Sequence, residues 1–245
     1  MPETKGSDGV AIGFEWCAGP RPVVLVHGFG SNAQMTWVDT GWVRALAAAE
    51  RGVLTLDLRG HGMSGKPTEP DAYSPEVMAG DVMAVMDAVG LETADVVAYS
   101  LGSRIALKVA QAAPQRVGSL VLGGIGTREL FQSWDLDSIQ SFLRDGVPVD
   151  DPLVMKLFTG AISLPGADAV ALLSCVEGMR GHDVTRPAAL RALVVAGEAD
   201  TAAAGAVTLA AELGARFVSL PGRNHMNALS ARSFKQAALE FLDET

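Results

Sequence analysis

The sequence predicts an α/β protein in which helices cover both faces of a mostly parallel sheet and a separate helical segment is inserted. Short apolar runs of the kind that parallel sheets bury on both faces alternate with stretches of helical periodicity. One of these apolar runs ends at a serine that directly opens a helix. A segment of about 60 residues later interrupts the alternation, and it is too long for an ordinary loop.

The apolar runs mark the expected strands. Val10–Trp16 alternates apolar and small side chains, which predicts an edge strand in an antiparallel hairpin. The later runs are continuously apolar and rich in β-branched residues, so they predict buried parallel strands. In chain order these runs are Pro22–His27, Val53–Leu58, Val96–Ala98, Val117–Ile125, Leu190–Ala196 and Phe217–Leu220.

Segments with an apolar face at helical spacing lie between the strands. One of them starts with Pro75 at the first helical position, where Ser74 would be the N-cap. The expected helices are Thr36–Glu50, Pro75–Val89, Leu101–Ala110, Thr201–Leu213 and Ser233–Leu242. Strands that alternate with helices in this way are typical of a parallel sheet with helices on both faces.

The inserted segment Thr127–Arg186 contains no strand-like run but several helix-like stretches. These stretches are Asp135–Arg144, Asp151–Phe158 and Ala167–Met179. We interpret residues 127–186 as a small helical cap on a core domain formed by residues 1–126 and 187–245.

Large apolar side chains are frequent in this expected cap. They are Phe131, Trp134, Leu136, Ile139, Phe142, Met155, Leu157, Phe158, Leu172, Leu173 and Met179. Because a cap of this size is too small to bury all of these side chains internally, we expect some of them to form an apolar roof over the active site. Such a roof would favour an uncharged acyl group, because it offers a charged one no compensation for lost hydration.

Composition excludes some partners. A net charge of −9 and an isoelectric point of about 4.9 disfavour binding to nucleic acid or to an anionic membrane. No secretory signal is visible, and the longest stretch without Asp, Glu, Lys or Arg, residues 22–38, is too polar to span a membrane. We therefore expect a soluble cytoplasmic protein, of an oligomeric state that the sequence leaves open.

No metal or cofactor motif is present. Cys17 and Cys175 have neither metal nor redox spacing, so both are expected to be free thiols that are at least partly buried. The sequence has no His-Glu-x-x-His, no P-loop and no Gly-x-Gly-x-x-Gly after a strand. These observations favour chemistry that needs no cofactor and no metal.

Ser100 is the candidate nucleophile. It stands in Ala98–Gly102 (Ala-Tyr-Ser-Leu-Gly), one methyl group away from the Gly-x-Ser-x-Gly turn that projects a serine above a sheet. The residues two before and two after the serine must be small in such a turn. The backbone N–H of Leu101, which opens the following helix, would point at a developing oxyanion. A serine at a helix start is also a common N-cap, so the remaining site residues must decide.

A nucleophilic serine needs a base and an acid that orients the base. His225 follows the last strand and therefore lies at the carboxyl edge of the sheet, where Ser100 also emerges. Asp200 and Glu198 both follow the preceding strand and are the candidates for the acid. The alternative role of Asp200 is a helix N-cap, and Glu198 could equally be a solvated loop residue.

Five motifs in this order resemble the α/β-hydrolase superfamily over nearly the whole chain, apart from the inserted segment. They are Val26–Gly30 (Val-His-Gly-Phe-Gly), Asp57–Gly65 (Asp-Leu-Arg-Gly-His-Gly-Met-Ser-Gly), Ala98–Gly102, Gly197–Asp200 and Gly222–His225. The chain order Ser100, Asp200, His225 is also that of the superfamily, and by this resemblance Asp200 is our choice for the acid over Glu198. The resemblance implies an α/β-hydrolase fold with a helical cap. Ala98 in place of the usual glycine adds only a methyl group, which the superfamily tolerates.

The resemblance also implies further roles. Phe29 would supply a second oxyanion-hole N–H beside that of Leu101, and its ring would line the pocket. His27 would support this loop and would not act as a base. Asp57, Arg59 and His61 would have structural roles.

The implied function is a serine hydrolase that cleaves small to medium carboxylic esters through an acyl-enzyme. The alternative within the same apparatus is a carbon–carbon bond hydrolase or a lactonase. A non-catalytic ligand receptor on this fold is the alternative of another class, but a pure receptor has no use for a complete triad. Epoxide hydrolases and haloalkane dehalogenases are disfavoured, because their resemblance would require Asp at position 100.

Overall fold

The computed structural model describes residues 2–129, 131–187 and 190–244, and within these residues eight strands form one sheet. The strand order is β1-β2-β4-β3-β5-β6-β7-β8. Strands β1 and β2 pair antiparallel, as do β2 and β4, and the other pairs are parallel. The strands are β1 Glu3–Lys5, β2 Ala11–Cys17, β3 Val23–Val26, β4 Val53–Leu56, β5 Ala94–Tyr99, β6 Val117–Gly123, β7 Ala192–Gly197 and β8 Arg216–Leu220.

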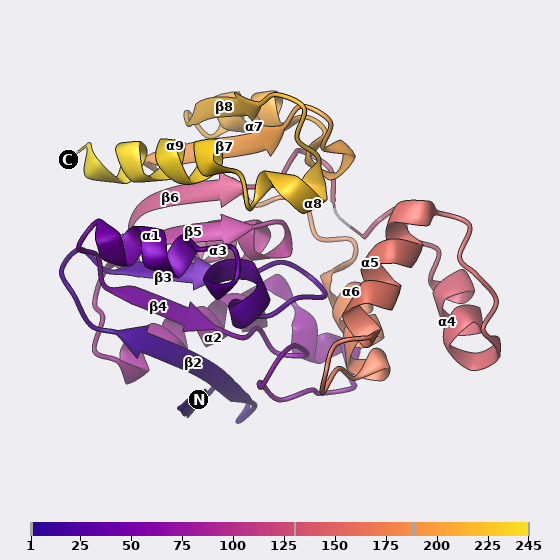
Figure 1. Cartoon of the computed structure of the whole chain (residues 1–245). Coiled ribbons are helices and arrows are strands. Elements are labelled where there is room, and N and C mark those ends of the chain that lie inside the picture. Colours follow the sequence, from indigo (N-terminus) through magenta and orange to yellow (C-terminus); the bar gives the residue numbers. More distant parts are fainter. Residues whose placement is uncertain (1, 130, 188–189, 245) are drawn as a thin grey trace.

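Helices cover both faces of the sheet (Figure 1). Helices α2, α3 and α7 pack on one face, and α1 and α9 pack on the other. The α-helices are α1 Trp42–Ala48, α2 Pro75–Ala88, α3 Leu101–Ala112, α4 Leu136–Asp145, α5 Pro152–Ile162, α6 Ala169–Met179, α7 Ala206–Glu212, α8 His225–Ala228 and α9 Arg232–Asp243. Short helical turns are η1 Gln34–Val38, η2 Pro70–Tyr73, η3 Pro114–Arg116 and η4 Thr201–Ala203. The expected mostly parallel α/β architecture is confirmed.

Two expected helices are interrupted by glycine. The helix predicted over residues 36–50 is divided into η1 and α1 at Gly41, and the one predicted over residues 201–213 is divided into η4 and α7 at Gly205. Both glycines have a positive φ, of 82° and 81°. Glycine adopts this left-handed conformation without steric cost, so the chain can turn between two short helices. The predicted Ser74 cap is confirmed, since its side chain accepts from the N–H of Val77.

The N-terminal strand pair differs from the expectation. Val10–Trp16 was expected to form the sheet edge, but β1 lies outside β2 and forms the edge itself. Its alternating three-residue pattern is too short to be recognised from sequence. The cysteines also differ in part: both are free and Cys175 is buried, but Cys17 is exposed near the end of β2.

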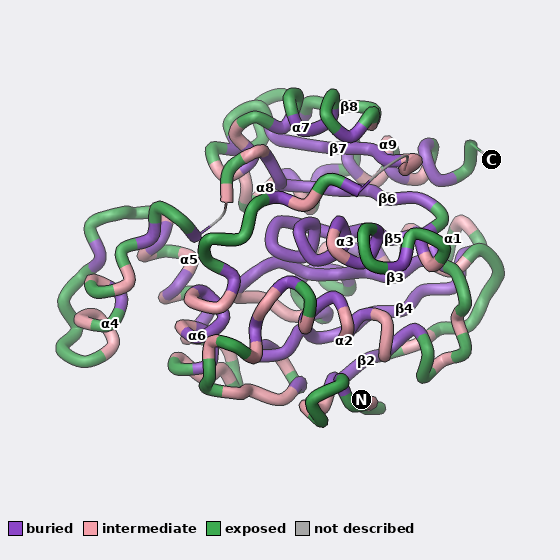
Figure 2. The backbone as a smooth tube through the Cα atoms, turned by 180° about the vertical axis from the view of Figure 1, so that it is seen from behind, coloured by how far each residue is buried: buried purple, intermediate pink, exposed green. Residues whose placement is uncertain are grey.

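The segment between β6 and β7 carries α4, α5 and α6. These helices lie beyond the carboxyl ends of the parallel strands (Figure 1). Each helix begins at an aspartate, Asp135, Asp151 or Asp168, whose side chain accepts one or two backbone N–H groups of the first turn. In the view from behind, strands β3, β4, β5, β6 and β7 are almost wholly buried, whereas α4 is mostly exposed or half-buried (Figure 2).

Helix α6 connects the inserted segment to the core. The hydroxyl of Ser174 donates to the carbonyl of Thr68 over 2.6 Å. Gly178 lies so close to Pro70 that an added Cβ would stand 2.1 Å from the Pro70 carbonyl oxygen. No helix among the described residues is both long enough and apolar enough to cross a bilayer.

Candidate active site

Ser100 lies at the junction between β5 and α3 in a strained backbone conformation. Its φ is 56° and its ψ is −118°, in a region that residues other than glycine rarely adopt, at a typical cost of about 1–3 kcal/mol. The N–H of Ser100 donates to the carbonyl of Gly123 over 2.8 Å, and the N–H of Ser103 donates to the carbonyl of Ser100 over 3.0 Å. These bonds on both sides hold the turn and fix the direction of the serine side chain.

Two glycines allow strand β3 to approach this turn. A Cβ on Gly102 would stand 2.2 Å from the carbonyl oxygen of Val26 and 2.5 Å from that of His27. A Cβ on Gly28 would stand 3.1 Å from the Cβ of Ser100. The small residue expected at position 102 is thus required by the close approach of the end of β3.

The structure brings Ser100, His225 and Asp200 together. The Nε2 atom of His225 lies 3.0 Å from the Oγ of Ser100. The Nδ1 atom lies 2.9 Å from one carboxylate oxygen of Asp200 and 3.0 Å from the other. An ionised carboxylate only accepts hydrogen bonds, so Nδ1 carries the ring proton and Nε2 is left to accept the hydroxyl proton of Ser100. His225 is the first residue of the short helix α8.

Asp200 has two roles at once. Its Oδ1 accepts the N–H groups of Ala202 and Ala203 at the start of η4, which is the N-cap role considered from the sequence. The same side chain is fully buried against His225. Glu198, the other acid considered, instead accepts the N–H of Gly222 through Oε2 at the surface. Because the capping bonds fix the carboxylate, its position against the imidazole is set by the backbone.

The loop after β3 lies against the nucleophile. The N–H groups of Phe29 and Leu101, expected to hold an oxyanion, donate to no protein acceptor among the described residues. Leu101 is the first residue of α3, and the first N–H groups of a helix have no partner within it. Both N–H groups are therefore available to a ligand. Their role in catalysis stays a prediction.

Two buried histidines fix this loop. The N–H of Leu58 donates to Nε2 of His27 over 3.0 Å, so the Nδ1–H of His27 donates to the carbonyl of Gly28, 2.8 Å away. In the same way, the N–H of Gly30 donates to Nε2 of His61 over 3.0 Å. Burial lowers the pKa of both imidazoles, and that of His61 falls to about 3. Both rings are therefore neutral supports of the loop, and neither contacts Ser100.

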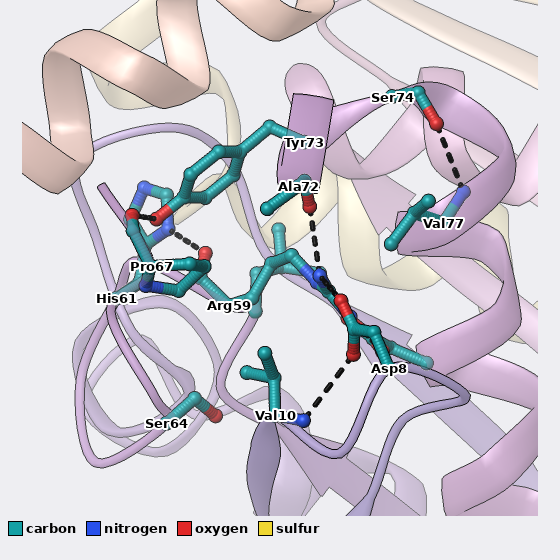
Figure 3. A network of polar contacts seen from close by, with 12 residues as sticks. Asp8, Val10, Arg59, His61, Ser64, Pro67, Ala72, Tyr73, Ser74 and Val77 are labelled. Carbon is teal, nitrogen blue, oxygen red and sulfur yellow. Dashed lines mark hydrogen bonds and ion pairs between the residues drawn. The ribbon is translucent and has the colours of Figure 1, made fainter. Parts of the chain in front are cut away.

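Asp57 and Arg59 hold the neighbouring loop. Asp57 accepts the N–H groups of Ala33 and Met63, each over 2.8 Å. Figure 3 shows the Arg59 guanidinium between the carboxylate of Asp8 and the carbonyl of Ala72. Arg59 is fully buried and also pairs with the buried Asp81, at 2.6 Å from its Nε. These contacts connect the N-terminus, α2 and the loop after β4, which agrees with the structural role that the resemblance implied.

A cavity of about 510 Å³ lies over Ser100 and His225. Its walls are predominantly apolar. They are formed by the loop after β3 together with η1 (Gly28, Phe29, Gly30, Ser31, Met35 and Thr36), by the residues around Ser100 and His225 (Tyr99, Ser100, His225, Met226 and Leu229) and by the inserted segment (Phe131, Trp134, Lys156, Leu157, Thr159, Gly160, Ala161, Ser163 and Leu164). Phe131, Trp134 and Leu157 were among the side chains from which an apolar roof was expected.

An aromatic cluster joins the loop of Phe29 to the inserted segment. The Phe29 ring lies edge-on to Phe131 and Trp134, with ring centroids 5.3 Å and 5.5 Å away. Phe158 stacks at 6.4 Å, and His61 makes an edge contact at 5.6 Å. Such contacts fix the position of the inserted segment relative to the nucleophile.

Some lining residues were missed from the sequence. Tyr99 was read only as part of the serine turn, although its hydroxyl donates to the carbonyl of His225 over 2.6 Å. Lys156 was not singled out, although it is the only charged residue in the otherwise apolar stretch Pro152–Ile162. A single charged residue among uncharged ones was the signal that could have identified Lys156 from the sequence. No cluster of His, Cys, Asp and Glu in the described part of the chain is arranged to hold a metal ion.

Several of the curated proteins that this chain resembles are hydrolases, and each match covers only part of the relative. A 2-hydroxymuconate semialdehyde hydrolase from Pseudomonas sp. strain CF600 is 35% identical over 103 residues, which are 42% of this chain and 36% of the relative. A putative carbamate hydrolase from Caulobacter segnis is 39% identical over 106 residues, 43% of this chain and 38% of the relative. The matched region thus spans less than two fifths of the length of either relative.

Solved structures match over nearly the whole chain. An enol-lactonase from Burkholderia xenovorans LB400 superimposes with a TM-score of 0.79 and 24% identity, covering 99% of this chain and 100% of that one. An esterase from Exiguobacterium antarcticum gives a TM-score of 0.80 and 19% identity, with 99% of both chains covered. At these identities the likeness concerns the fold. The family model for the alpha/beta hydrolase fold matches residues 21–145, and with the sheet described above it shows that the chain belongs to the α/β-hydrolase family.

Proposed function

We propose that the protein is a serine hydrolase that cleaves small to medium carboxylic esters through an acyl-enzyme. The observation that carries this proposal is the chain of hydrogen bonds from Asp200 through His225 to Ser100 at the wall of a cavity. Ester hydrolysis needs no group beyond a nucleophile, an oriented base and oxyanion donors.

The reaction follows from this geometry. Ser100 Oγ attacks the ester carbonyl carbon while Nε2 of His225 takes the hydroxyl proton. The N–H groups of Phe29 and Leu101 stabilise the oxyanion, and Asp200 stabilises the imidazolium. The C–O bond to the leaving group breaks, and the imidazolium protonates the departing alcohol. Water then attacks the acyl-enzyme with His225 as base, which releases the acid and restores Ser100.

In this proposal residues 127–186 act as a cap on a core of residues 1–126 and 187–245. Phe131, Trp134 and Leu157 cover the acyl chain from above. Burial of apolar substrate surface contributes about 25 cal/mol per Å². A roof over the site leaves no open groove for long chains, so the preferred acyl group is short to medium in length.

A carbon–carbon bond hydrolase or a lactonase is the second candidate. It is favoured by the 2-hydroxymuconate semialdehyde hydrolase among the relatives and by the enol-lactonase among the structures. Both reactions could use the same three side chains.

The test is kcat/KM across 4-nitrophenyl esters with acyl chains of two to sixteen carbons, beside an enol lactone and a 2-hydroxy-6-oxo-dienoate. The expected result is ester turnover with a maximum at short to medium chains. Turnover of the lactone or the dienoate far above that of every ester would replace this proposal by the second candidate. A maximum at the longest chains would contradict the role given to the cap.

A further inference from the structure

Lys156 stands out on the cavity wall. Among the described lining residues, Lys156 is the only one that ordinarily carries a full charge. Apart from His225, the others are apolar residues, glycines, and residues with hydroxyl or thioether side chains. Lys156 makes no ion pair with another described residue, and its side chain is therefore available to a ligand.

Lys156 lies on the part of α5 that borders the cavity. It lines the cavity together with Thr159, Gly160 and the apolar residues Leu157 and Ala161 of the same helix. Lys156 is exposed, whereas Val154 and Phe158 are buried and do not line the cavity. The lysine is thus an exposed cation beside a mostly apolar part of the wall.

The neighbouring hydroxyl groups cannot replace the ammonium as donors. The hydroxyl of Thr159 donates to the carbonyl of Met155 over 2.6 Å, and that of Ser163 donates to the carbonyl of Thr159 over 2.6 Å. Each hydroxyl has only one proton, and both protons are used within the helix. Among the lining side chains of α5, Lys156 is therefore the one that can donate to a substrate.

The net charge of the protein bears on which ligand Lys156 can bind. With a net charge of −9, the molecule as a whole repels anions, so an anion that binds at the cavity needs a local cation. A single ammonium group beside apolar walls is matched to a single negative charge, whereas a phosphate dianion is usually held by several donors.

We propose that Lys156 binds a carboxylate at the end of the substrate remote from the bond that is cleaved. This inference rests on the proposed function and narrows its substrate class to half-esters or related monoanionic acyl compounds of short to medium length. It differs from the uncharged acyl group expected from the sequence, because that expectation considered the apolar residues of the inserted segment and not Lys156.

The experiment compares two esters that differ only in charge, 4-nitrophenyl hydrogen adipate and 4-nitrophenyl methyl adipate. In the wild type the ratio of their kcat/KM values should favour the anion. Lys156→Met should lower that ratio by about two- to fivefold, the size expected for one exposed ion pair, and should leave the methyl ester close to its wild-type value. Lys156→Arg should retain the ratio, and Lys156→Glu should lower it further.

Lys5→Met is the matched control. It changes the net charge by the same amount on the exposed strand β1, outside the cavity lining. The ratio should stay at its wild-type value in this variant. An unchanged ratio in Lys156→Met, or an equal fall in Lys5→Met, would overturn the inference and leave Lys156 as a solvated surface residue.

A binding measurement separates this inference from the proposed function. In a Ser100→Ala background, calorimetry with monomethyl adipate and dimethyl adipate measures recognition without turnover. Tighter binding of the monoanion that is lost in Ser100→Ala/Lys156→Met supports the carboxylate site even if the wild type cleaves neither ester. Equal binding of both compounds rejects the carboxylate site whatever the enzyme hydrolyses.

Discussion

The hydroxyl of Tyr99 donates to the backbone carbonyl of His225 over 2.6 Å, and the two rings lie with centroids 5.3 Å apart. Tyr99 precedes Ser100 in the chain, whereas His225 lies 125 residues after that serine. The Tyr99 side chain thus connects the backbone next to Ser100 with the backbone of His225. We infer that Tyr99 is a positioning residue for His225.

Replacing Tyr99 by Phe should lower kcat about tenfold with little change in KM, since a hydrogen bond of about 1–1.5 kcal/mol that holds the base is lost. Steady-state kinetics with a 4-nitrophenyl ester measures both constants. Tyr73→Phe is the matched control, because the Tyr73 hydroxyl donates to the carbonyl of Pro67 over the same 2.6 Å but lies outside the cavity lining. Equal losses of kcat in the two variants would show that Tyr99 acts only through stability.

Replacing Ser100 by Ala should lower kcat by about 10⁴-fold or more, with the remaining rate supplied by the oxyanion donors. A fluorophosphonate probe should label the wild type at Ser100 and fail to label the variant. Ser103→Ala is a control one turn away. It removes the hydrogen bond from Ser103 Oγ to the Gly123 carbonyl, at 2.9 Å, and should reduce stability while turnover persists. Retention of a tenth of the activity in Ser100→Ala would exclude this nucleophile.

Replacing Asp200 by Asn should lower kcat far more than replacing Glu198 by Gln. The asparagine amide can still cap η4, but it no longer stabilises the imidazolium and can favour the wrong ring tautomer, which in a serine triad lowers kcat by about 10⁴-fold. Glu198 only accepts the N–H of Gly222, so Glu198→Gln should stay near the wild-type rate. The reverse order of losses would move the acid to Glu198.

The buried histidines predict a loss of stability in mild acid. The pKa of His61 is lowered by burial from 6.5 to about 3, so between these values the unfolded chain binds a proton that the folded chain does not. The free energy of unfolding should therefore fall as the pH drops from about 6.5 towards 3, by up to about 1.4 kcal/mol per pH unit for this residue.

Urea unfolding at several pH values between 4 and 7 measures this slope. His61→Gln should reduce the slope by up to one proton, because glutamine does not titrate but can still accept the N–H of Gly30. His182→Gln, at an exposed position in the inserted segment, should leave the slope as it is. Parallel slopes in the wild type and in His61→Gln would contradict a neutral His61.

The sequence by itself determined every strand except β1, the approximate positions of the helices that cover the sheet, and the serine turn. These features depend on local patterns: apolar runs for Val23–Val26 and Val53–Leu56, helical periodicity for Pro75–Ala88, and small residues around Ser100. The order of Ser100, Asp200 and His225 along the chain could be read as well, because parallel strands end at one edge of the sheet. The β1 strand and the breaks at Gly41 and Gly205 were missed, since short or glycine-interrupted segments carry little periodic signal.

Only the tertiary structure decided which side chains meet. Asp200 and Glu198 share one loop, and the resemblance favoured Asp200 as the acid. The capping bonds of η4 direct Asp200 to His225 and leave Glu198 at the surface. The packing of α5 places Lys156 at the cavity, and the role inferred for Tyr99 depends on a hydrogen bond to a residue 126 positions away along the chain. Such contacts depend on how separate elements pack, and the local pattern of residues does not encode that packing.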